Sequence, residues 1–298
     1  MERMSIATES LDLVNLTALM ELTSGDPEIV IGLIDGPVLT DHPDLASEKI
    51  RTVPEKAEGR CTRPDSVACV HGTFVAGILC ARRDSAAPAI CPGCTLLARP
   101  IFSETTSLNE LIPSATPEEL AMAIIECIDA GARLLNLSAA LAQVASAKGE
   151  RALAQALDYA AARGVIVVAA SGNQGTVGST AITRHPAVIA VIACDRLGRP
   201  LSLSNLGSSI GRRGLSAPGE GVTSSGADGK ALPSGGTSVA APFVTGAIAL
   251  VWSEFFDASA SQLRLAVTQA HAPRRAAVVP PLLNAWALYQ AMAAHSRR

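Results

Sequence analysis

Three residues far apart in the chain have side chains that together could catalyse acyl transfer: Asp35, His71 and Ser238. A serine hydroxyl becomes a nucleophile when a nearby base takes its proton, and the base needs a carboxylate to hold it in the right tautomer. Ser238 follows two glycines and begins a long apolar run, so we expect it in the first turn of a buried helix. Free N–H groups and the positive end of the helix dipole favour developing negative charge there. Serine is also a common helix cap, so its placement alone leaves both interpretations open.

The elements that would position these residues alternate between strand and helix. Asp35 ends an apolar strand over residues 28–34, and His71 lies in the first turn of an apolar helix that begins at residue 70. Continuous apolar runs are typical of strands covered on both faces, as in a parallel sheet under helices. Further strands are expected at 95–98, 133–137, 165–170 and 187–193, and further helices at 117–130, 149–163, 237–253, 259–270 and 284–295. The alternation predicts an α/β fold, with three α/β/α layers around a central, mostly parallel sheet.

Composition and charge narrow the class of protein. Of the 298 residues, 48% are hydrophobic and 17% are charged, which predicts a globular chain with a large core. No internal repeat or linker is visible, so we expect a helical extension over residues 1–26 and a single domain over residues 27–298. The net charge is −3 and no basic run exceeds a pair, so no nucleic-acid partner is expected. No pattern predicts an oligomeric state.

The sequence also bears on location. The N-terminus shows no signal-peptide pattern, because polar residues interrupt its apolar stretch and no small-residue cleavage site follows. The longest apolar run, residues 239–252, is below spanning length and contains Pro242. We therefore expect no membrane association and a cytoplasmic location.

The seven cysteines do not follow a secreted disulfide pattern. Three of them lie in apolar helix or strand patterns and are expected in the core: Cys80, Cys127 and Cys194. The other four could form disulfides or a zinc site: Cys61, Cys69, Cys91 and Cys94. The spacing of the first two is too long for a usual zinc knuckle, and a cytosolic location argues against permanent disulfides. Free or redox-labile thiols and no metal are therefore expected.

Three segments carry the candidate residues: 34–36 (Ile-Asp-Gly), 71–77 (His-Gly-Thr-Phe-Val-Ala-Gly) and 236–242 (Gly-Thr-Ser-Val-Ala-Ala-Pro). In sequence and in chain order they resemble the signature segments of the subtilisin-like serine proteases. The resemblance spans about residues 27–292 and implies a subtilisin-like fold. It also implies that Ser238 is the nucleophile, that His71 is the general base and then the acid, and that Asp35 orients His71.

Two further segments match the same family. Residues 168–175 resemble the segment whose asparagine amide donates into the oxyanion hole, which implies that role for Asn173. Residues 136–140 resemble the edge segment that pairs with an extended peptide. The resemblance implies that two runs line opposite walls of the S1 pocket: Ser138, Ala139, Ala140 and Ala170, Ser171, Gly172. The family usually has glycine where Ala140 stands, which predicts a narrower or reshaped pocket.

The residues after Asp35 depart from the usual family pattern of serine or threonine and then glycine. The segment Asp35-Gly36-Pro37-Val38, together with residues 24–27 and 100–102, resembles the proteases of cyanobactin-type peptide maturation. Those enzymes remove leader or follower segments from ribosomally made precursors, and one branch also joins the ends into a ring. The ring-forming branch carries a helical insertion between its Asp and His, for which residues 36–70 leave little room.

We therefore expect a serine endopeptidase that processes a ribosomally made precursor peptide by hydrolysis. Two alternatives stay open: a transpeptidating macrocyclase of the same family, and a catalytically inactive protein that only binds peptides. No cofactor is expected. The loop that gives many family members a strong calcium site is replaced by residues 81–87, which contain one carboxylate, so no tight calcium site is expected.

Overall fold

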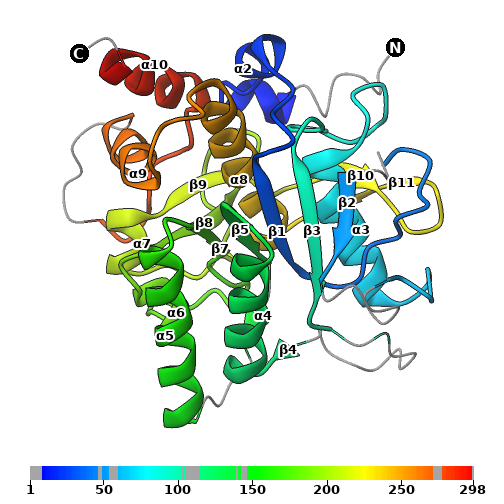
Figure 1. Cartoon of the computed structure of the whole chain (residues 1–298), viewed down its shortest axis with the longest axis horizontal. Helices are drawn as coiled ribbons and strands as arrows, with labels where there is room; N and C mark the ends of the chain where they lie inside the picture. The colour runs from blue at the N-terminus through cyan, green and yellow to red at the C-terminus, as the bar shows by residue number, and fades with distance from the viewer. Residues whose placement is uncertain are drawn as a thin grey trace.

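The computed structural model describes residues 9–45, 49–53, 60–102, 104, 114–138, 140–141, 146–270 and 277–296. A seven-stranded sheet with every pairing parallel forms its centre (Figure 1). From one edge to the other the strands are β2 Ile50–Thr52, β3 Thr95–Pro100, β1 Val30–Asp35, β5 Leu134–Leu137, β7 Ile166–Ala170, β8 Val188–Cys194 and β9 Leu215–Pro218. Parallel neighbours need long crossover connections, which the predicted alternation of strands and helices supplies.

Helices cover both faces of this sheet (Figure 1). One face carries α3 Val67–Cys80 and α8 Thr237–Glu254, with α2 Thr17–Leu22, α9 Ala260–Gln269 and α10 Ala285–Ser296 packed around them. The other face carries α4 Pro117–Asp129, α5 Ala147–Ala162, α6 Ala181–Arg184 and α7 Ser208–Arg213. The expected three-layer α/β/α fold is confirmed.

Two small sheets complete the described strands. Strands β10 Val222–Ser225 and β11 Ala231–Ser234 form an antiparallel pair, and α3 packs against β10. Strands β4 Ser114–Ala115 and β6 Ala140–Leu141 form a short parallel pair beyond the end of β5.

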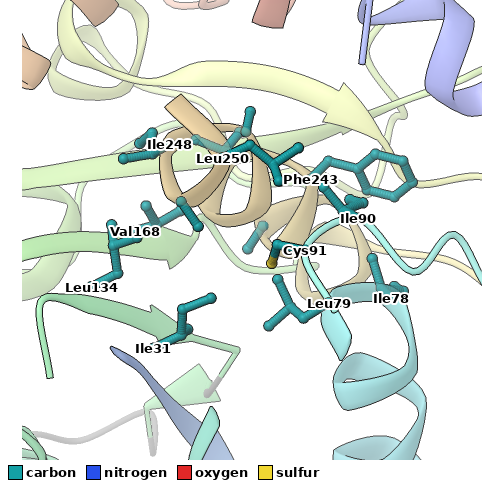
Figure 2. Close-up of a cluster of buried hydrophobic side chains, with 14 of the residues drawn as sticks. Ile31, Ile78, Leu79, Ile90, Cys91, Leu134, Val168, Phe243, Ile248 and Leu250 are labelled. Atoms are coloured by element: carbon teal, nitrogen blue, oxygen red, sulfur yellow. The ribbon is translucent and has the colours of Figure 1, made fainter. Parts of the chain in front are cut away.

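Helix α8 lies in the centre of the core. Almost every residue along it is buried, as expected for a helix that is apolar on all sides. Figure 2 shows side chains of α8, among them Phe243, in one buried cluster with Val168 of the sheet and Leu79 of α3. At Gly246 a Cβ atom would lie 2.6 Å from Ile90 Cγ2, so glycine allows the loop after α3 to approach closely. This packing fixes the start of α8, where Ser238 lies.

The residues before the sheet also contribute to the core. Leu16 and Leu19 are fully buried, and α2 contacts α8 and α10. The domain boundary that we expect at residue 26 stays a prediction. Among the helices that the structure describes, none is long and apolar enough to reach across a bilayer.

The structure differs from two sequence-based expectations. Helix α3 begins at Val67 rather than at residue 70, because the Ser66 side chain accepts a hydrogen bond from Cys69 N at 3.1 Å and caps the helix there. Cys61 and Cys69 are joined by a disulfide and are not free thiols. The chain before α3 returns to its first turn and brings their Cα atoms to 5.5 Å, within the range that a disulfide spans. The other five cysteines are buried and free, as expected: Cys80, Cys91, Cys94, Cys127 and Cys194.

Candidate active site

The structure brings Asp35, His71 and Ser238 together. His71 Nδ1 lies 2.6 Å from Asp35 Oδ1, and His71 Nε2 lies 3.0 Å from Ser238 Oγ. With its proton on Nδ1, the imidazole donates to the carboxylate and presents Nε2 as the acceptor for the serine hydroxyl. The three side chains therefore form one continuous path for a proton leaving Ser238.

Close backbone packing sets this geometry. Asp35 is fully buried at the carboxyl end of β1, and the next residue, Gly36, lies directly against α3. A Cβ atom at Gly36 would lie 1.9 Å from the carbonyl oxygen of Ala68, and one at Gly72 would lie 2.3 Å from the carbonyl oxygen of Gly36. Glycine on both sides therefore lets the first two turns of α3 reach the end of β1. Because α3 starts earlier than expected, His71 lies in its second turn and not in its first.

The Asp35 carboxylate has few donors. Its Oδ1 accepts from His71 and from Gly36 N, the latter at 2.6 Å. Its Oδ2 is buried and has no hydrogen-bond partner among the described residues. Gly36 has no side-chain hydroxyl and Pro37 has no N–H, so neither of the next two side chains nor the Pro37 backbone can supply a donor. His71 is therefore the main stabilising partner of this buried charge.

The same pair sets the protonation of His71. Burial of the imidazole disfavours its charged form, but the Asp35 charge and the hydrogen bond to it outweigh that effect. The pKa of His71 is therefore raised above its ordinary value of 6.5. A base that binds a proton more strongly than free imidazole is suited to remove the serine proton.

Asn173 lies beside the start of α8, where its amide could stabilise an oxyanion. Its Oδ1 accepts from Thr237 N at 2.9 Å and from Thr237 Oγ1 at 3.0 Å. Gly236, with a φ of 118°, brings its Cα close to the amide, since a Cβ there would lie 3.0 Å from Asn173 Nδ2. The amide oxygen of Asn173 therefore already has its donors in Thr237, whereas no described residue accepts a hydrogen bond from Asn173 Nδ2. This amide nitrogen is the donor that a developing oxyanion would need.

Asn205, which the sequence analysis did not single out, holds the turn that carries Asn173. Its Nδ2 donates to the carbonyl oxygen of Ser171 at 3.1 Å, and its Oδ1 accepts from Gln174 N and Thr176 N, each at 3.1 Å. A polar residue inside the Leu-Ser-Asn-Leu stretch was the only sequence signal for it. Asn205 therefore fixes the backbone on both sides of Asn173.

A second buried polar group connects β5 with α8. Pro242 cannot donate to the carbonyl of Ser238 four residues earlier, and that carbonyl accepts instead from Ser138 Oγ at 3.5 Å. Asn136 Nδ2 donates to Ser138 Oγ at 2.8 Å, and Thr245 Oγ1 donates to Asn136 Oδ1 at 2.8 Å. Asn136 and Thr245 are fully buried. These contacts tie the strand before the candidate S1 wall to the helix that carries Ser238.

The predicted substrate-binding residues differ in where they lie relative to Ser238. Ser138 contacts the Ser238 carbonyl through its Oγ. Ala170 to Gly172 lead from β7 into the turn that carries Asn173, and Gly172 N donates to Thr237 Oγ1 at 3.2 Å. Ala139 falls outside the described residues. The backbone of Ala140 pairs with Ser114 in the small β4–β6 sheet, so this part of the expected peptide-binding edge already has a strand partner.

Among the described residues, one group of side chains has the spacing of metal ligands: Cys61, Cys69 and Glu104. The two sulfur atoms are bonded to each other, so this structure presents them as a disulfide and not as two thiolates.

The chain is similar in sequence to known bacterial proteases. Residues 26–281 match the subtilase family. Subtilisin DY from Bacillus licheniformis is 31% identical over 241 residues, which are 79% of this chain and 81% of that protein. Subtilisin E from Bacillus subtilis (strain 168) is 29% identical, and the matched region is 58% of its length.

Solved structures with the same fold include three peptide-maturation proteins. The patellamide maturation protease PatA is 30% identical with a TM-score of 0.75, covering 91% of this chain and 98% of that one. The prenylagaramide maturation protease PagA is 26% identical with a TM-score of 0.79, covering 93% and 98%. The PatG macrocyclase domain, at 22% identity and a TM-score of 0.78, shares the fold over 94% and 96%.

Proposed function

Because this chain belongs to the subtilase family of serine proteases, we propose that Asp35, His71 and Ser238 are its catalytic triad and that it cleaves peptide bonds as an endopeptidase. The observation that carries this proposal is the hydrogen-bonded series from Ser238 Oγ through His71 to Asp35 Oδ1. Three such side chains from different elements have no structural need to align in this order.

In each half-reaction His71 acts first as general base and then as general acid. Ser238 Oγ attacks the carbonyl carbon of the scissile bond while its proton passes to His71 Nε2, and Asp35 stabilises the imidazolium. The oxyanion accepts hydrogen bonds from Asn173 Nδ2 and from the Ser238 backbone N–H at the start of α8. His71 then gives the proton to the leaving amine, and the acyl-enzyme remains. A water molecule then attacks the ester while one of its protons passes to His71 Nε2, and His71 gives that proton to Ser238 Oγ as the C–Oγ bond breaks and the carboxylic acid leaves.

We further propose that the substrate is a ribosomally made precursor peptide. PatA and PagA, whose structures this chain matches over nine-tenths of its length, are maturation proteases for patellamide and prenylagaramide. The short 36–70 segment favours hydrolysis over ring formation. The likeness to the PatG macrocyclase domain concerns the fold alone and adds no support for transpeptidation.

Labelling with a fluorophosphonate tests the triad directly. We expect covalent labelling of the wild-type protein and none of Ser238→Ala, with the exposed Ser202→Ala as the matched control that labels normally. Labelling that persists in Ser238→Ala would refute the assignment. A protein that binds peptides but neither labels nor cleaves would be the inactive alternative.

Mass spectrometry of the products tests the substrate proposal. Incubation with candidate precursor peptides is expected to give linear fragments whose summed mass exceeds the precursor by one water. A cyclic product without added water would identify transpeptidation instead.

The cytoplasmic location is part of the same proposal. The Cys61–Cys69 disulfide argues against it, because such bonds are rare in a reducing compartment. Fractionation of the producing cells tests it, and recovery of the protein outside the cytoplasm would overturn it.

A further inference from the structure

Cys91 and Cys94 share one tight turn, here called the 91–94 turn. Cys94 N donates to the carbonyl oxygen of Cys91 at 3.0 Å, and Pro92 and Gly93 form the corner between them. A hydrogen-bonded turn of four residues holds its end Cα atoms within about 7 Å, close to the upper limit of about 6.8 Å that a disulfide spans. The two thiols are also hydrogen-bonded to each other. The pair could therefore close to a disulfide with little movement of the backbone.

The 91–94 turn is anchored to two other parts of the chain. Cys91 N donates to the carbonyl oxygen of Leu79, in the last turn of α3, at 2.8 Å, and Gly93 N donates to that of Ser24 at 2.7 Å. Figure 2 shows Cys91 near Leu79 in the buried cluster around α8. The backbone that carries the two thiols is therefore already ordered by contacts that do not involve sulfur.

The two sulfur atoms have different surroundings. The hydrogen bond from the Cys91 thiol lowers the pKa of Cys94, burial opposes this effect, and the Asp26 N–H adds to it. The hydrogen bond to Cys94 and burial both raise the pKa of Cys91. Lys49 Nζ donates to the carbonyl oxygens of the two residues between the cysteines, at 3.3 and 3.4 Å, and places a positive charge beside the turn. Cys94 is therefore suited to react first as a thiolate, with Cys91 as the thiol that follows.

A thin cover separates Cys94 from solvent. Neither thiol of the 91–94 turn has exposed surface, but Gly25 lies over Cys94 and is itself only half-buried. A Cβ atom at Gly25 would lie 2.5 Å from Cys94 Sγ, and the neighbouring Ser24 is exposed. Cys127, by contrast, lies beneath the central strand β1, where a Cβ atom at Gly32 would lie 3.2 Å from its Sγ. A small opening of one backbone segment would thus admit a small oxidant to Cys94.

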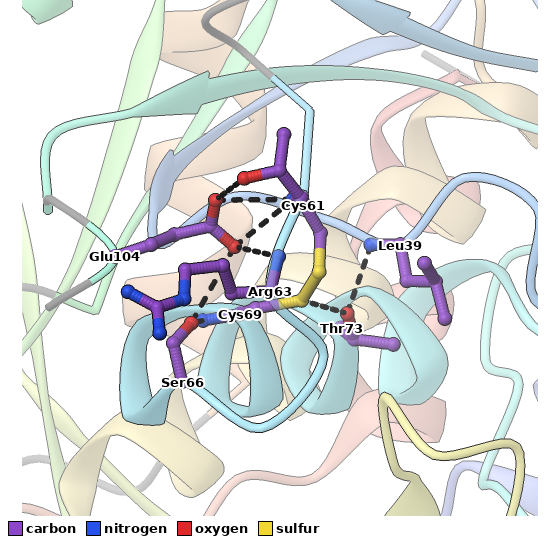
Figure 3. The surroundings of a disulfide bond; sticks show 8 residues. Leu39, Cys61, Arg63, Ser66, Cys69, Thr73 and Glu104 are labelled. Atoms are coloured by element: carbon purple, nitrogen blue, oxygen red, sulfur yellow. Dashed lines mark hydrogen bonds between the residues drawn. A yellow bond between two sulfur atoms is a disulfide. The ribbon is translucent and has the colours of Figure 1, made fainter. Parts of the chain in front are cut away.

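We propose that Cys91 and Cys94 are a redox-active pair that a small peroxide converts to a disulfide, which makes the 91–94 turn an oxidation site separate from the proposed active site. The pair differs from Cys61 and Cys69, which are already bonded to each other and join the chain before α3 to its first turn (Figure 3). This redox chemistry does not depend on the proposed endopeptidase function.

The oxidation takes two steps. The Cys94 thiolate attacks one oxygen of hydrogen peroxide, the O–O bond breaks, and the departing hydroxide takes up the proton that Cys94 had released, so that water leaves and Cys94 becomes a sulfenic acid. Cys91 Sγ then attacks Cys94 Sγ, the S–O bond breaks, and the Cys91 proton leaves with the hydroxyl group as a second water. Two thiols thereby lose two electrons and two protons, and one peroxide is reduced to two water molecules.

Peptide mapping of the full chain tests this chemistry. The folded protein is treated with hydrogen peroxide at mildly alkaline pH, quenched with catalase, unfolded in urea with N-ethylmaleimide and digested, so that tandem mass spectrometry finds each cysteine free or bonded. We expect a Cys91–Cys94 disulfide to form at least about tenfold faster than Cys127 is oxidised. Burial raises the pKa of Cys127 to about 12, so it is ionised far less than Cys94, although a thiolate of lower pKa loses part of this advantage in nucleophilicity. Dithiothreitol should return Cys91 and Cys94 to thiols.

Single variants separate the two roles. In Cys91→Ser the serine hydroxyl can still donate to Cys94, whose sulfenic acid then has no partner thiol and should be trapped with dimedone. In Cys94→Ser the remaining thiol is expected to react at least about tenfold more slowly than Cys94 does in Cys91→Ser, because burial still raises the pKa of Cys91. Cys127→Ala is the control and should form the Cys91–Cys94 disulfide within about twofold of the wild-type rate. Urea unfolding shows beforehand that each variant is folded.

Wild-type Cys91 and Cys94 that stay free in peroxide, or that react no faster than Cys127, would overturn the inference. So would a disulfide that forms only after unfolding in urea, or one that joins Cys94 to Cys80. These results need no substrate and no labelling of Ser238, so they are independent of the outcome for the proposed function.

Discussion

Replacement of Gly36 by alanine is expected to disable the proposed triad, although residue 36 carries no catalytic group. A Cβ atom at this position would lie 1.9 Å from the carbonyl oxygen of Ala68 and 2.6 Å from its carbonyl carbon. Ordinary non-bonded contacts begin near 3.5 Å, so the end of β1 and α3 would have to separate by about 1.5 Å. The two Ala68 atoms belong to the backbone, so no side-chain rotation can relieve the contact.

The separation would act directly on catalysis. His71 is four residues from the start of α3, and its 2.6 Å contact with Asp35 and 3.0 Å contact with Ser238 both depend on where that helix lies. A displacement of about 1 Å at reacting groups can lower the rate by about 10²-fold. We therefore expect kcat/KM and the fluorophosphonate labelling rate to fall by at least about 10²-fold in Gly36→Ala. Overpacking should also lower the free energy of unfolding by about 1–3 kcal/mol.

The assay pairs labelling rates with urea unfolding. Gly178→Ala is the control, because a Cβ there meets no atom within 4 Å and its φ is not positive. Gly36→Ser separates the steric effect of a side chain at residue 36 from the effect of a missing donor to Asp35, since its hydroxyl could donate to Asp35 Oδ2, which has no partner among the described residues. If the steric contact decides, Ser and Ala lose activity alike. Wild-type rates and stability in Gly36→Ala would refute the reasoning.

Three further predictions concern the surrounding groups. Asn173→Ala should lower kcat by about 10²–10³-fold with little change in KM, since the amide acts on the oxyanion and not on the bound substrate, and steady-state kinetics measure this. The kcat/KM of the wild type should rise with pH as His71 loses its proton, with a midpoint above 6.5. In Asp35→Asn the midpoint should move to lower pH, because the Asp35 charge no longer raises the pKa of His71 while burial still lowers it. Thr245→Val should lower the free energy of unfolding in urea by about 1–3 kcal/mol, because it leaves the buried Asn136 Oδ1 without its donor. The exposed Thr268→Val, which loses only an intrahelical contact, should cost less than about 0.5 kcal/mol.

The sequence was sufficient to predict the five central strands of the sheet and the three layers, because those features depend on local patterns, whereas the edge strand β2 was not predicted. An apolar run ends at Asp35, and the helix expected at 117–130 is present as α4, whose start is fixed by a capping box of Thr116 and Glu119. The start of α3 was missed because Ser66 caps it from within an irregular stretch that has no apolar periodicity. The disulfide was missed because it depends on how the chain returns to α3, and because the expected compartment argued against it.

Residues that only position other residues are even harder to recognise in the sequence. Asn205 is distant from Asn173 in the chain, and its role depends on five hydrogen-bonding contacts with residues 171–176. Thr245 lies in an apolar helix, where a threonine can bond to its own helix and often does. Here it also reaches Asn136 on a strand 109 residues earlier. Such partners follow from the fold and not from spacing.

The early start of α3 explains why glycine follows Asp35. The extra turn of α3 places the Ala68 carbonyl where a side chain at residue 36 would begin, so only glycine fits there. The same glycine removes the hydroxyl that a serine or threonine would offer, and Pro37 removes an N–H, so Asp35 Oδ2 has no donor in the part of the chain that the structure describes. A buried carboxylate with so few donors depends on His71 for its stabilisation. The alignment of the proposed triad is therefore set by backbone packing between β1 and α3, and substitutions at that contact should affect catalysis more than the loss of any single donor to Asp35 other than His71.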